Sequence, residues 1–595
     1  MTTDCTIIAE VACVHEGDRG YLRDLARAAR DAGADAVKFQ MFSAREVVST
    51  DHPDFAYLER ISFTEDEWVA IGDECAAFGL GVFIDASGPF SFAVASRLRA
   101  NLKGLKIHSS DVQNPDVVHR VRDFGVPVLI GCGGTPLVDL FEAVGILGPD
   151  CRTVLMHGHQ SFPKLAGAPG GPPVRGVSSD ELELWRVAWL KRTFPDAQVG
   201  LADHLAGDEP FAILAPALAV ALGATVIEKH FTLNREAHRE DYFSALEPGE
   251  FQQMVAAIRE TTRAVGRDRR TLPESERGYE REMKRAPVVT RSLDAGSIVG
   301  NDDVTLVRTG SYESAARPTR VVSRRLKTSV KAGTPLTNAH LDCVVGVFCN
   351  ARLASSRLPR KALLPFYGEH TTLGYLLKRL QSYPGAIGQV VLATTTQPED
   401  DALEAIAAAV GVPCFRGESE DVMGRMVGCA DAFGWDVLVR VTGDDQLVSG
   451  EYIERALRHH LDHSLDYTRM DGLPIGMASE IIDVRTLRQI HRAVVNRRQT
   501  EHLTWYLDSD LICRNDVIQA DAADRHPELR VTLDYLQDYE LMRAVTQRAH
   551  ERVRSFYVPT ATLIETLLEL DPAWHHESTL WPLTRAQVNT DLVYR

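Results

Sequence analysis

The sequence has few of the features that would assign it to a secreted, disulfide-linked or zinc-binding class. Its ten cysteines are scattered, with no CxxC pair and no regular spacing. The simple interpretation is a reduced protein. The N-terminal segment MTTDCTIIAEV also lacks the basic region that begins a secretory signal peptide. Together these absences predict a cytoplasmic protein.

Positive charges are fewer than negative charges, and long apolar runs are scarce. The chain has 65 Lys and Arg against 82 Asp and Glu, a net charge of −17, which argues against a nucleic-acid partner but allows a locally basic site for small anions. One segment, 210–227, has about the minimum length of a membrane span. Pro216 and Gly223 interrupt it and charged residues flank it. We therefore expect a buried helix followed by a buried strand, and no membrane partner.

The length of 595 residues indicates more than one domain. In the first 270 residues, short β-rich apolar runs alternate with helical patterns such as 21–33 and 65–79. The runs are 7–11, 36–40, 81–86, 104–109, 126–132, 153–158, 199–204 and 225–231. Eight strands alternating with helices predict a (β/α)8 TIM barrel, and an open doubly wound sheet is the alternative.

The remaining chain divides by composition. After the barrel (1–270) comes a charged linker, 271–284, and then a small β-rich module, 285–346. A second alternating pattern over 347–575 predicts a Rossmann-like, mostly parallel sheet. No element is predicted for the tail, 576–595. The fold class is therefore multidomain α/β.

Polar residues recur where the barrel strands end, the rim on which TIM-barrel active sites are built. His204 and His230 end adjacent strands, and two imidazoles there suit a metal ion. Strand periodicity puts Glu228 on the same face as His230, where we expect it to orient that ring or balance a metal's charge. Lys38 and Lys106 suit a phosphate or carboxylate. The alternatives are hydrogen-bonded rim histidines and surface lysines.

The second α/β region has its own candidate site. The loop NARLASSRLPRK (350–361) follows a strand and is rich in small and basic residues, as phosphate-binding loops are, although no Walker A motif is present. Asp444 and Asp534 follow later strands and suit Mg²⁺. The alternative is a solvated basic loop with surface carboxylates. For Asp538 we prefer a helix-capping role.

Residues 6–262 resemble the sialic acid synthase family, which is built on a TIM barrel. The matching phrases are IIAEVACVHEGD, AGADAVKFQMF, LKIHSSD, GLADH, LGATVIEKHFTL and SALEPGEF. The module 285–346 is similar to the antifreeze-like (SAF) domain that follows the barrel in these synthases. The resemblance implies condensation of phosphoenolpyruvate (PEP) with the aldehyde of an open-chain N-acyl hexosamine, giving a nonulosonic acid and phosphate.

The resemblance also implies roles for individual residues. His204 and His230 would hold a divalent metal, usually Mn²⁺, that polarises the aldehyde, and Glu10 would contact the sugar or the attacking water. Arg308 of the SAF module would reach a partner's barrel, which implies a domain-swapped homodimer. The implied catalytic residues of the barrel are Glu10, Lys106, His204 and His230. Those implied to bind PEP or sugar are Lys38, Lys106, Ser109, Gln40, Gln160, Asp241 and Arg308.

Several positions depart from the family pattern. The usual FISTPFS is FIDASGPFS here (83–91), which removes a phosphate-facing Thr unless Ser87 substitutes. Ala202 replaces the Ser of LSDH, and Gln160 and Phe162 stand where the family has an N-x-Y pair. The interpretation is an altered sugar specificity, and loss of PEP condensation is the alternative.

Residues 347–543 resemble sugar-acid cytidylyltransferases of the spore-coat polysaccharide type, with CMP-sialate synthetases as relatives. The matching phrases are RLASSRLPRKAL, VVLATTTQPEDDALE, FRGESEDVMGR, RVTGDD, GMASEIIDVRTL, TEHLTWYL and RVTLDYLQDYEL. The resemblance implies that the sugar acid attacks the α-phosphate of CTP and releases pyrophosphate. Asp444 and Asp534 would hold Mg²⁺, with Asp444 catalytic. The residues implied to hold CTP are Arg352, Ser355, Arg357 and Lys361, and those implied near the sugar are Glu480, Glu501 and His502.

The leading hypothesis is a bifunctional enzyme that makes a nonulosonic acid from PEP and a hexosamine-type sugar and then activates it with CTP. The order of the domains favours it, because the product of the first half would be the substrate of the second. One alternative is that one half, more plausibly the barrel, has lost catalysis and serves as a scaffold. Another is a sugar-acid binding protein without catalysis. Sialic, legionaminic, pseudaminic and deaminated nonulosonates all remain open as the product.

Overall fold

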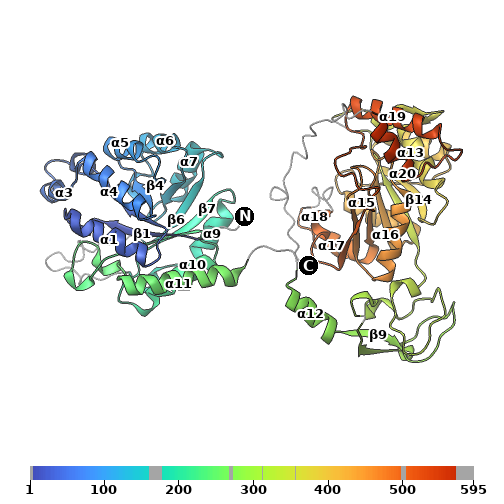
Figure 1. Cartoon of the computed structure of the whole chain (residues 1–595), viewed down its shortest axis with the longest axis horizontal. Coiled ribbons are helices and arrows are strands. Elements are labelled where there is room, and N and C mark those ends of the chain that lie inside the picture. The colour runs from blue at the N-terminus through green and yellow to red at the C-terminus, as the bar shows by residue number, and fades with distance from the viewer. Residues whose placement is uncertain are drawn as a thin grey trace. The chain divides into compact units, whose positions relative to one another are not determined.

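The structure is a computed structural model that describes residues 5–159, 177–266, 272–310, 312–354, 357–496 and 504–570. The chain divides into two compact units, Met1–Asp268 and Arg269–Arg595 (Figure 1). Each unit has its own sheet and its own apolar core.

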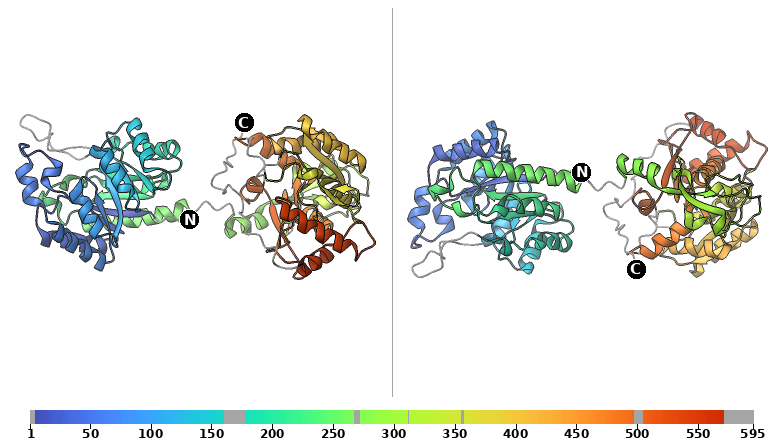
Figure 2. Two further views of the ribbon diagram at one scale, coloured as in Figure 1. Left: turned by 90° about the horizontal axis from the view of Figure 1, so that it is seen from above. Right: turned by 90° about the horizontal axis from the view of Figure 1, so that it is seen from below.

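The first unit is a closed parallel barrel surrounded by helices (Figures 1 and 2). β1 pairs with both β2 and β8, which excludes the open-sheet alternative. The strands are β1 (Thr6–Ala12), β2 (Ala36–Phe39), β3 (Gly81–Asp85), β4 (Leu102–Ile107), β5 (Val128–Gly131), β6 (Thr153–His157), β7 (Gln198–Asp203) and β8 (Val226–His230). The main helices are α1 (Arg19–Asp31), α4 (Glu65–Ala77), α5 (Pro89–Arg97), α6 (Pro115–Arg122), α7 (Leu137–Leu147), α9 (Trp185–Thr193), α10 (Ala215–Ala221) and α11 (Pro248–Val265).

Local sequence signals set where these helices begin and end. Thr64 and Glu67 form a reciprocal capping box at the start of α4, which satisfies two backbone N–H groups that have no intrahelical partner. Gly33 and Gly79 follow α1 and α4 at φ of +91° and +81°. Glycine adopts this left-handed conformation without the cost of a Cβ clash, so both helices stop where the sequence predicts.

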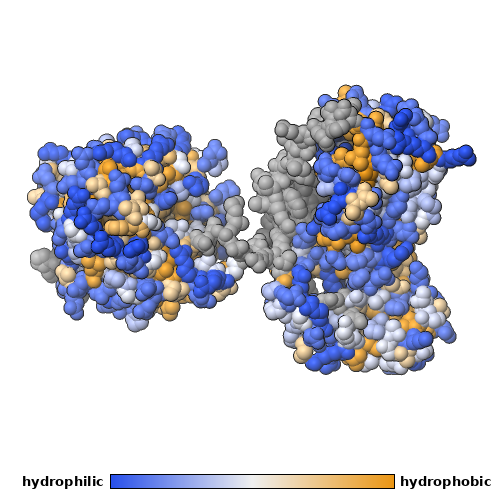
Figure 3. Space-filling view, viewed as in Figure 1, coloured by the Kyte–Doolittle hydropathy of each residue, from blue (hydrophilic) through white to orange (hydrophobic). Residues whose placement is uncertain are grey.

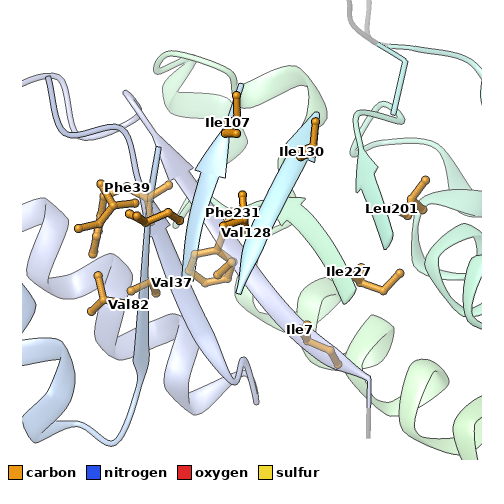
Figure 4. Close-up of a cluster of buried hydrophobic side chains, with 14 of the residues drawn as sticks. Ile7, Val37, Phe39, Val82, Ile107, Val128, Ile130, Leu201, Ile227 and Phe231 are labelled. Carbon is orange, nitrogen blue, oxygen red and sulfur yellow. The ribbon is translucent and has the colours of Figure 1, made fainter. Parts of the chain in front are cut away.

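The barrel strands place alternate side chains on opposite faces. Outward residues, among them Ile7, Val37 and Ile227, pack under the helices in the main core (Figure 4). Inward residues, among them Ile8 and Val226, form a separate cluster that fills the interior. Continuing the same inward parity toward the carboxyl ends of the strands leads to charged residues, so the packed interior supports a polar layer above it.

The apolar segment 210–227 forms a short 3-10 turn, η3 (Pro210–Ile213), the helix α10 and the beginning of β8. The predicted order of buried helix and buried strand is therefore confirmed. Within the described ranges, no helix combines the length and apolar character that a membrane crossing requires. The surface drawn in Figure 3 is largely hydrophilic, with hydrophobic residues in small areas.

The second unit begins with α12 (Glu274–Met283) and the small module, in which β9 (Arg285–Val289) pairs with β10 (Val304–Arg308). A seven-stranded sheet follows in the order β15-β14-β11-β16-β18-β17-β19. Its strands are β11 (Val345–Asn350), β14 (Gln389–Thr395), β15 (Cys414–Gly417), β16 (Val437–Thr442), β17 (Tyr467–Asp471), β18 (Glu480–Asp483) and β19 (Asn515–Gln519). Antiparallel β18 interrupts an otherwise parallel sheet, as a mostly parallel Rossmann-like fold predicts.

Helices cover both faces of this sheet, so alternate residues of β11 enter different cores. Val347 belongs to one buried cluster, and the next residue, Phe348, belongs to another. The helices are α13 (Thr372–Gln381), α14 (Asp401–Ala409), α15 (Val422–Phe433), α16 (Gly450–Asp462), α17 (Val484–Ala493), α18 (Thr504–Leu507), α19 (Leu536–His550) and α20 (Thr560–Glu569). Burial on both faces explains the nearly continuous apolar runs of the central strands.

A buried arginine joins the small module to the sheet. Arg320 lies 2.8 Å from Asp483 and 3.1 Å from Asp466. Its other terminal nitrogen donates to the hydroxyl of Thr486 at 3.0 Å. Arg317 adds a second ion pair to Asp466. Burial acts to raise the pKa of Asp466, yet the two guanidinium groups hold it below its ordinary value.

We predict that Arg320→Met lowers the free energy of unfolding of this unit by about 3–5 kcal/mol, because two buried carboxylates then lose their shared cation. Urea titration of the full chain, read by hydrogen exchange in peptides from 285–346, measures the loss. Arg325→Met is the control, because Arg325 is exposed and donates to a carbonyl inside the module. Equal losses in both variants would contradict the role given to Arg320.

Candidate active sites

Five charged side chains occupy the inner wall of the barrel near the carboxyl ends of its strands. They are Glu10 of β1, Lys38 of β2, Asp85 of β3, Lys106 of β4 and Glu228 of β8, and all are buried. Glu10 is in register with Lys38, and Asp85 is in register with Lys106. Neighbouring strands therefore bring the charges together.

These residues form one ionic group, the lysine–carboxylate network. The Nζ atom of Lys38 pairs with Glu10, lies 2.8 Å from Asp85 and 3.8 Å from Glu228. Lys106 pairs with the same oxygen of Glu228. The network thus contains three carboxylates and two ammonium groups, and each ammonium group contacts at least one carboxylate. The predicted convergence of Lys38 and Lys106 is present, but their charges are already balanced inside the protein.

Burial and charge act on these groups in opposite directions. Burial raises the pKa of Glu10 to about 8, although Lys38 opposes the rise. Burial also acts to raise the pKa of Asp85 and of Glu228, but the lysines outweigh it and hold both below their ordinary values. Of the three carboxyl groups, Glu10 is therefore the one whose pKa is raised.

The two histidines lie beside this network. His204 follows β7 and His230 ends β8, with ring centroids 5.2 Å apart. The Nδ1 of His204 is 3.1 Å from the carbonyl of Ala202, so it donates there and leaves Nε2 available as a ligand. Burial lowers the pKa of His204 to about 4 and that of His230 well below its ordinary value.

Two neutral imidazoles at the ends of adjacent strands, His230 buried and His204 partly buried, fit a divalent transition metal. In the part of the chain that the structure describes, no group of three or more His, Cys, Asp or Glu side chains is arranged to hold a metal. The protein would therefore supply two ligands, and substrate or water would supply the others.

The structure contradicts one of the two roles expected of Glu228, that of orienting His230 by a hydrogen bond. Among the described residues it has no hydrogen bond to His230, and it accepts from Lys106 instead. An ammonium group attracts a buried carboxylate more strongly than a neutral imidazole does. Its neighbour Lys229 points outward, where it donates to the carbonyl of Leu205 at 2.8 Å and pairs with Asp203 at 2.9 Å.

The other barrel candidates lie in loops that follow the strands. Gln40 follows β2 and accepts a hydrogen bond from the thiol of Cys13 at 3.5 Å. Ser109 begins a 3-10 turn after β4, and Asp241 lies in the segment after β8 at φ +60°. Arg308 ends β10 in the second unit and is exposed. Gln160 lies outside the described residues.

In the second unit, Lys361 brings the two predicted carboxylates together. Its Nζ lies 3.0 Å from Asp444 and 3.3 Å from Asp534, and it donates to the carbonyl of Leu533 at 2.5 Å. Arg357 lies 3.0 Å from Asp534. Residues from the loop and from two later segments thus meet around one cation, as expected at a site for Mg²⁺ and phosphate.

A third carboxylate adjoins this group. Burial and the neighbouring charge of Asp444 raise the pKa of Asp445 to about 8, whereas Lys361 holds the pKa of Asp444 below its ordinary value against burial. Asp538 accepts from the backbone N–H groups of Asp534 and Tyr535 at 2.9 and 2.8 Å at the start of α19. That is the capping role the sequence suggests.

Sequence reasoning missed two residues. The sequence marks Asp85 as part of a changed phrase but gives no sign that it pairs with Lys38. Arg440 of β16 forms an ion pair with Glu480 at 2.5 Å, and Glu480 also accepts from the hydroxyl of Tyr467 at 2.6 Å. The signal for Arg440 is an arginine inside the apolar strand DVLVRVT. Arg352 lies in the loop after β11, and Ser355, Glu501 and His502 lie outside the described residues.

Comparison with known families gives three matches in order along the chain. Residues 25–270 match the NeuB family, 284–342 match the SAF domain, and 347–557 match the cytidylyltransferase family. The C-terminal part of the chain belongs to the cytidylyltransferase family, and a SAF domain joins it to a NeuB-family domain. The chain is thus a fusion of a NeuB-type synthase with a cytidylyltransferase, and both halves are enzyme domains.

Relatives match the halves separately. N,N'-diacetyllegionaminic acid synthase of Legionella pneumophila is 26% identical over 358 residues, 57% of this chain and 95% of the relative. Spore coat polysaccharide biosynthesis protein SpsF of Bacillus subtilis is 33% identical over 207 residues, 34% of this chain and 86% of the relative.

Two solved structures from Leptospira borgpetersenii also align with the chain. An N-acetylneuraminic acid (sialic acid) synthetase in complex with citrate has 24% identity and a TM-score of 0.41, covering 46% of this chain and 89% of that one. A cytidylyltransferase has 26% identity and a TM-score of 0.36, covering 40% of this chain and 100% of that one.

The outward pair of the NeuB barrel gives a stability prediction. Lys229→Met should lower the free energy of unfolding of the barrel by about 3–5 kcal/mol, because Asp203 is left buried and charged. Lys229→Met/Asp203→Asn should recover most of the loss, since the amide keeps the oxygen that accepts from Leu205 N–H at 2.9 Å. Urea unfolding measures both. A double variant no more stable than the single one would contradict this account of the pair.

Proposed function

We propose that the barrel condenses PEP with the aldehyde of an open-chain N-acyl hexosamine, and that the cytidylyltransferase transfers CMP from CTP to the resulting nonulosonic acid. The observation that carries this proposal is the union of NeuB, SAF and cytidylyltransferase domains in one chain. A NeuB-type condensation ends in a sugar acid, and a sugar acid is what a cytidylyltransferase of this kind activates. Relatives named as legionaminic and pseudaminic acid synthases support a nonulosonic product.

In the barrel, Lys38, Lys106 and Ser109 hold the phosphate and carboxylate of PEP. Burial raises the pKa of Glu10, which lies against Lys38, so Glu10 is suited to exchange a proton with the sugar or with the attacking water. His204 and His230 hold a divalent metal, Mn²⁺ by family resemblance, which when bound supplies Lewis-acid polarisation of the aldehyde oxygen.

The acceptor sugar is held by residues from the loops above the strands and from a second copy of the chain. Gln40, Gln160 and Asp241 contact the sugar in this proposal. Arg308 is exposed at the end of β10, which suits a residue that reaches into the barrel of a partner subunit. The active form is then a domain-swapped homodimer.

In the cytidylyltransferase, the chain binds CTP through basic residues and Mg²⁺ through carboxylates. Arg352, Ser355, Arg357 and Lys361 contact the phosphates, while Glu480, Glu501 and His502 lie near the sugar acid. Asp444 and Asp534 hold Mg²⁺, which when bound offsets charge on the phosphates. The contacts of Lys361 with both carboxylates support this proposal, because they bring Asp444 and Asp534 to one cation.

The test supplies the purified chain with PEP, CTP, Mn²⁺, Mg²⁺ and a panel of N-acyl hexosamines, and measures phosphate and pyrophosphate separately. Both products should form with a suitable hexosamine, and pyrophosphate should require PEP unless a sugar acid is added. Pyrophosphate that appears only with added sugar acid would contradict the proposed barrel reaction. Neither product across the panel would contradict both.

Variants should separate the two reactions. We predict that His230→Ala lowers phosphate release at least about 100-fold and leaves CMP transfer to an added sugar acid unchanged, because it removes one of two metal ligands. Asp444→Asn should give the converse pattern. The two assays on each variant measure this directly. Loss of both reactions in either variant would show that the sites do not act separately.

A further inference from the structure

In the barrel, the two lysines proposed to bind the anionic donor are already paired with carboxylates of the chain itself. Lys38, which we assign to the anionic donor, is paired with Glu10 and lies 2.8 Å from Asp85. Lys106 is paired with Glu228. Three carboxylates surround two ammonium groups, so the network carries no net positive charge for a phosphate whether or not Glu10 holds a proton.

Asp85 is the carboxylate whose removal would open this site. It belongs to FIDASGPFS, at a position where the resembling family has serine, and it ends β3 beside both lysine strands. A neutral residue at 85 would remove one of the negative charges that face Lys38. Its Oδ2 contacts Lys38, while Oδ1 is buried and has no hydrogen-bond partner among the described residues.

A buried carboxylate oxygen without a hydrogen-bond partner is costly. A second carboxylate near the end of β3 acts in the same sense. Glu46 accepts from the N–H of Phe90 with both oxygens at 3.1 Å, at the start of α5. A helix N-terminus attracts anions, and here an internal carboxylate occupies it. Two groups near the loop after β3 that could bind an anion, Lys38 and the N-terminus of α5, are thus already paired with carboxylates of the same chain.

We propose that Asp85 is an internal competitor for the donor anion and a specificity-determining residue of the barrel. The anionic donor binds Lys38 by separating it from Asp85. The affinity for the donor is therefore set by how well the donor replaces Asp85 as the partner of Lys38. Small anions that cannot replace the contacts of Lys38 with Glu10 and Asp85 are rejected. The identity of the donor as PEP rests on the proposed function, whereas the competition for Lys38 holds for any phosphate-bearing donor.

The test measures dissociation constants of PEP and of inorganic phosphate for the full-length chain by isothermal titration calorimetry. Asp85→Ser should bind both anions at least about tenfold more tightly than the natural chain, because one buried negative charge facing Lys38 is gone. Asp85→Asn keeps the shape of the side chain and should tighten both in the same direction, so it serves if the serine variant does not fold.

The matched control is Asp150→Asn, which removes one negative charge from an exposed position in the loop before β6, at the opposite ends of the strands. Its dissociation constants should stay within about twofold of those of the natural chain, since charges beyond a Debye length are screened. A general effect of net charge would shift this variant as much as Asp85→Ser.

The outcomes separate this inference from the proposed function. Unchanged or weaker anion binding in both folded Asp85 variants would overturn the competition, even if the natural chain binds PEP and releases phosphate. Tighter phosphate binding in those variants, with no PEP binding or turnover in any chain, would support the competition and overturn PEP as the donor. Tighter binding of both anions, with a lower KM for PEP and an unchanged KM for CTP, would support both.

Discussion

The contact of Lys38 with Glu10 and Asp85 is the interaction on which the barrel site depends. An isolated charge inside a barrel would be prohibitively costly, so each ammonium group there needs a carboxylate, and each carboxylate a cation or a proton. The network meets this requirement across five neighbouring strands. The same side chains that make the interior tolerable are those that a charged substrate must meet.

On the outer side of the barrel strands, the same need to pair buried charges is met by a pair whose role is structural. Asp203 and Lys229 lie between the strands and the helices, and the lysine also donates to a backbone carbonyl. Both groups face away from the barrel interior. Parity along one strand therefore separates Glu228 and His230 from Lys229: the first two point inward toward the proposed chemistry, and the third stabilises the wall.

The second unit also contains one cation with a structural role and one at a candidate active site. Arg320 is buried between the small module and the sheet, where it contacts two carboxylates and a hydroxyl. Lys361 instead connects the loop after β11 to Asp444, which follows β16, and to Asp534, which precedes α19. Ligands of α/β sheets bind at the carboxyl ends of their strands. The position of each cation in the fold, rather than its charge, distinguishes a structural contact from a candidate catalytic one.

Much of this could be read from the sequence, because it depends on local periodicity. The eight strands, the mostly parallel second sheet and the helix ends at Gly33 and Gly79 follow from apolar spacing and glycine conformation. The inward direction of Glu228 and His230 follows from the period of two along a strand. The placement of Asp444 near Lys361 follows from its position after β16. The strand expected before Asp534 is wrong: residues 531–534 form no strand, and Arg530 makes only an isolated bridge with Ile475.

The choice of ionic partner could not be read this way. The sequence puts Glu228 beside His230, but the closed barrel brings Lys106 from another strand within reach, and the stronger attraction decides. Lys38 meets Asp85, and Arg440 meets Glu480, because register sets which side chains face each other across strands. By itself the sequence determined which residues point inward. Only the tertiary structure decided which charges meet, since pairing depends on distances between strands that are far apart in the chain.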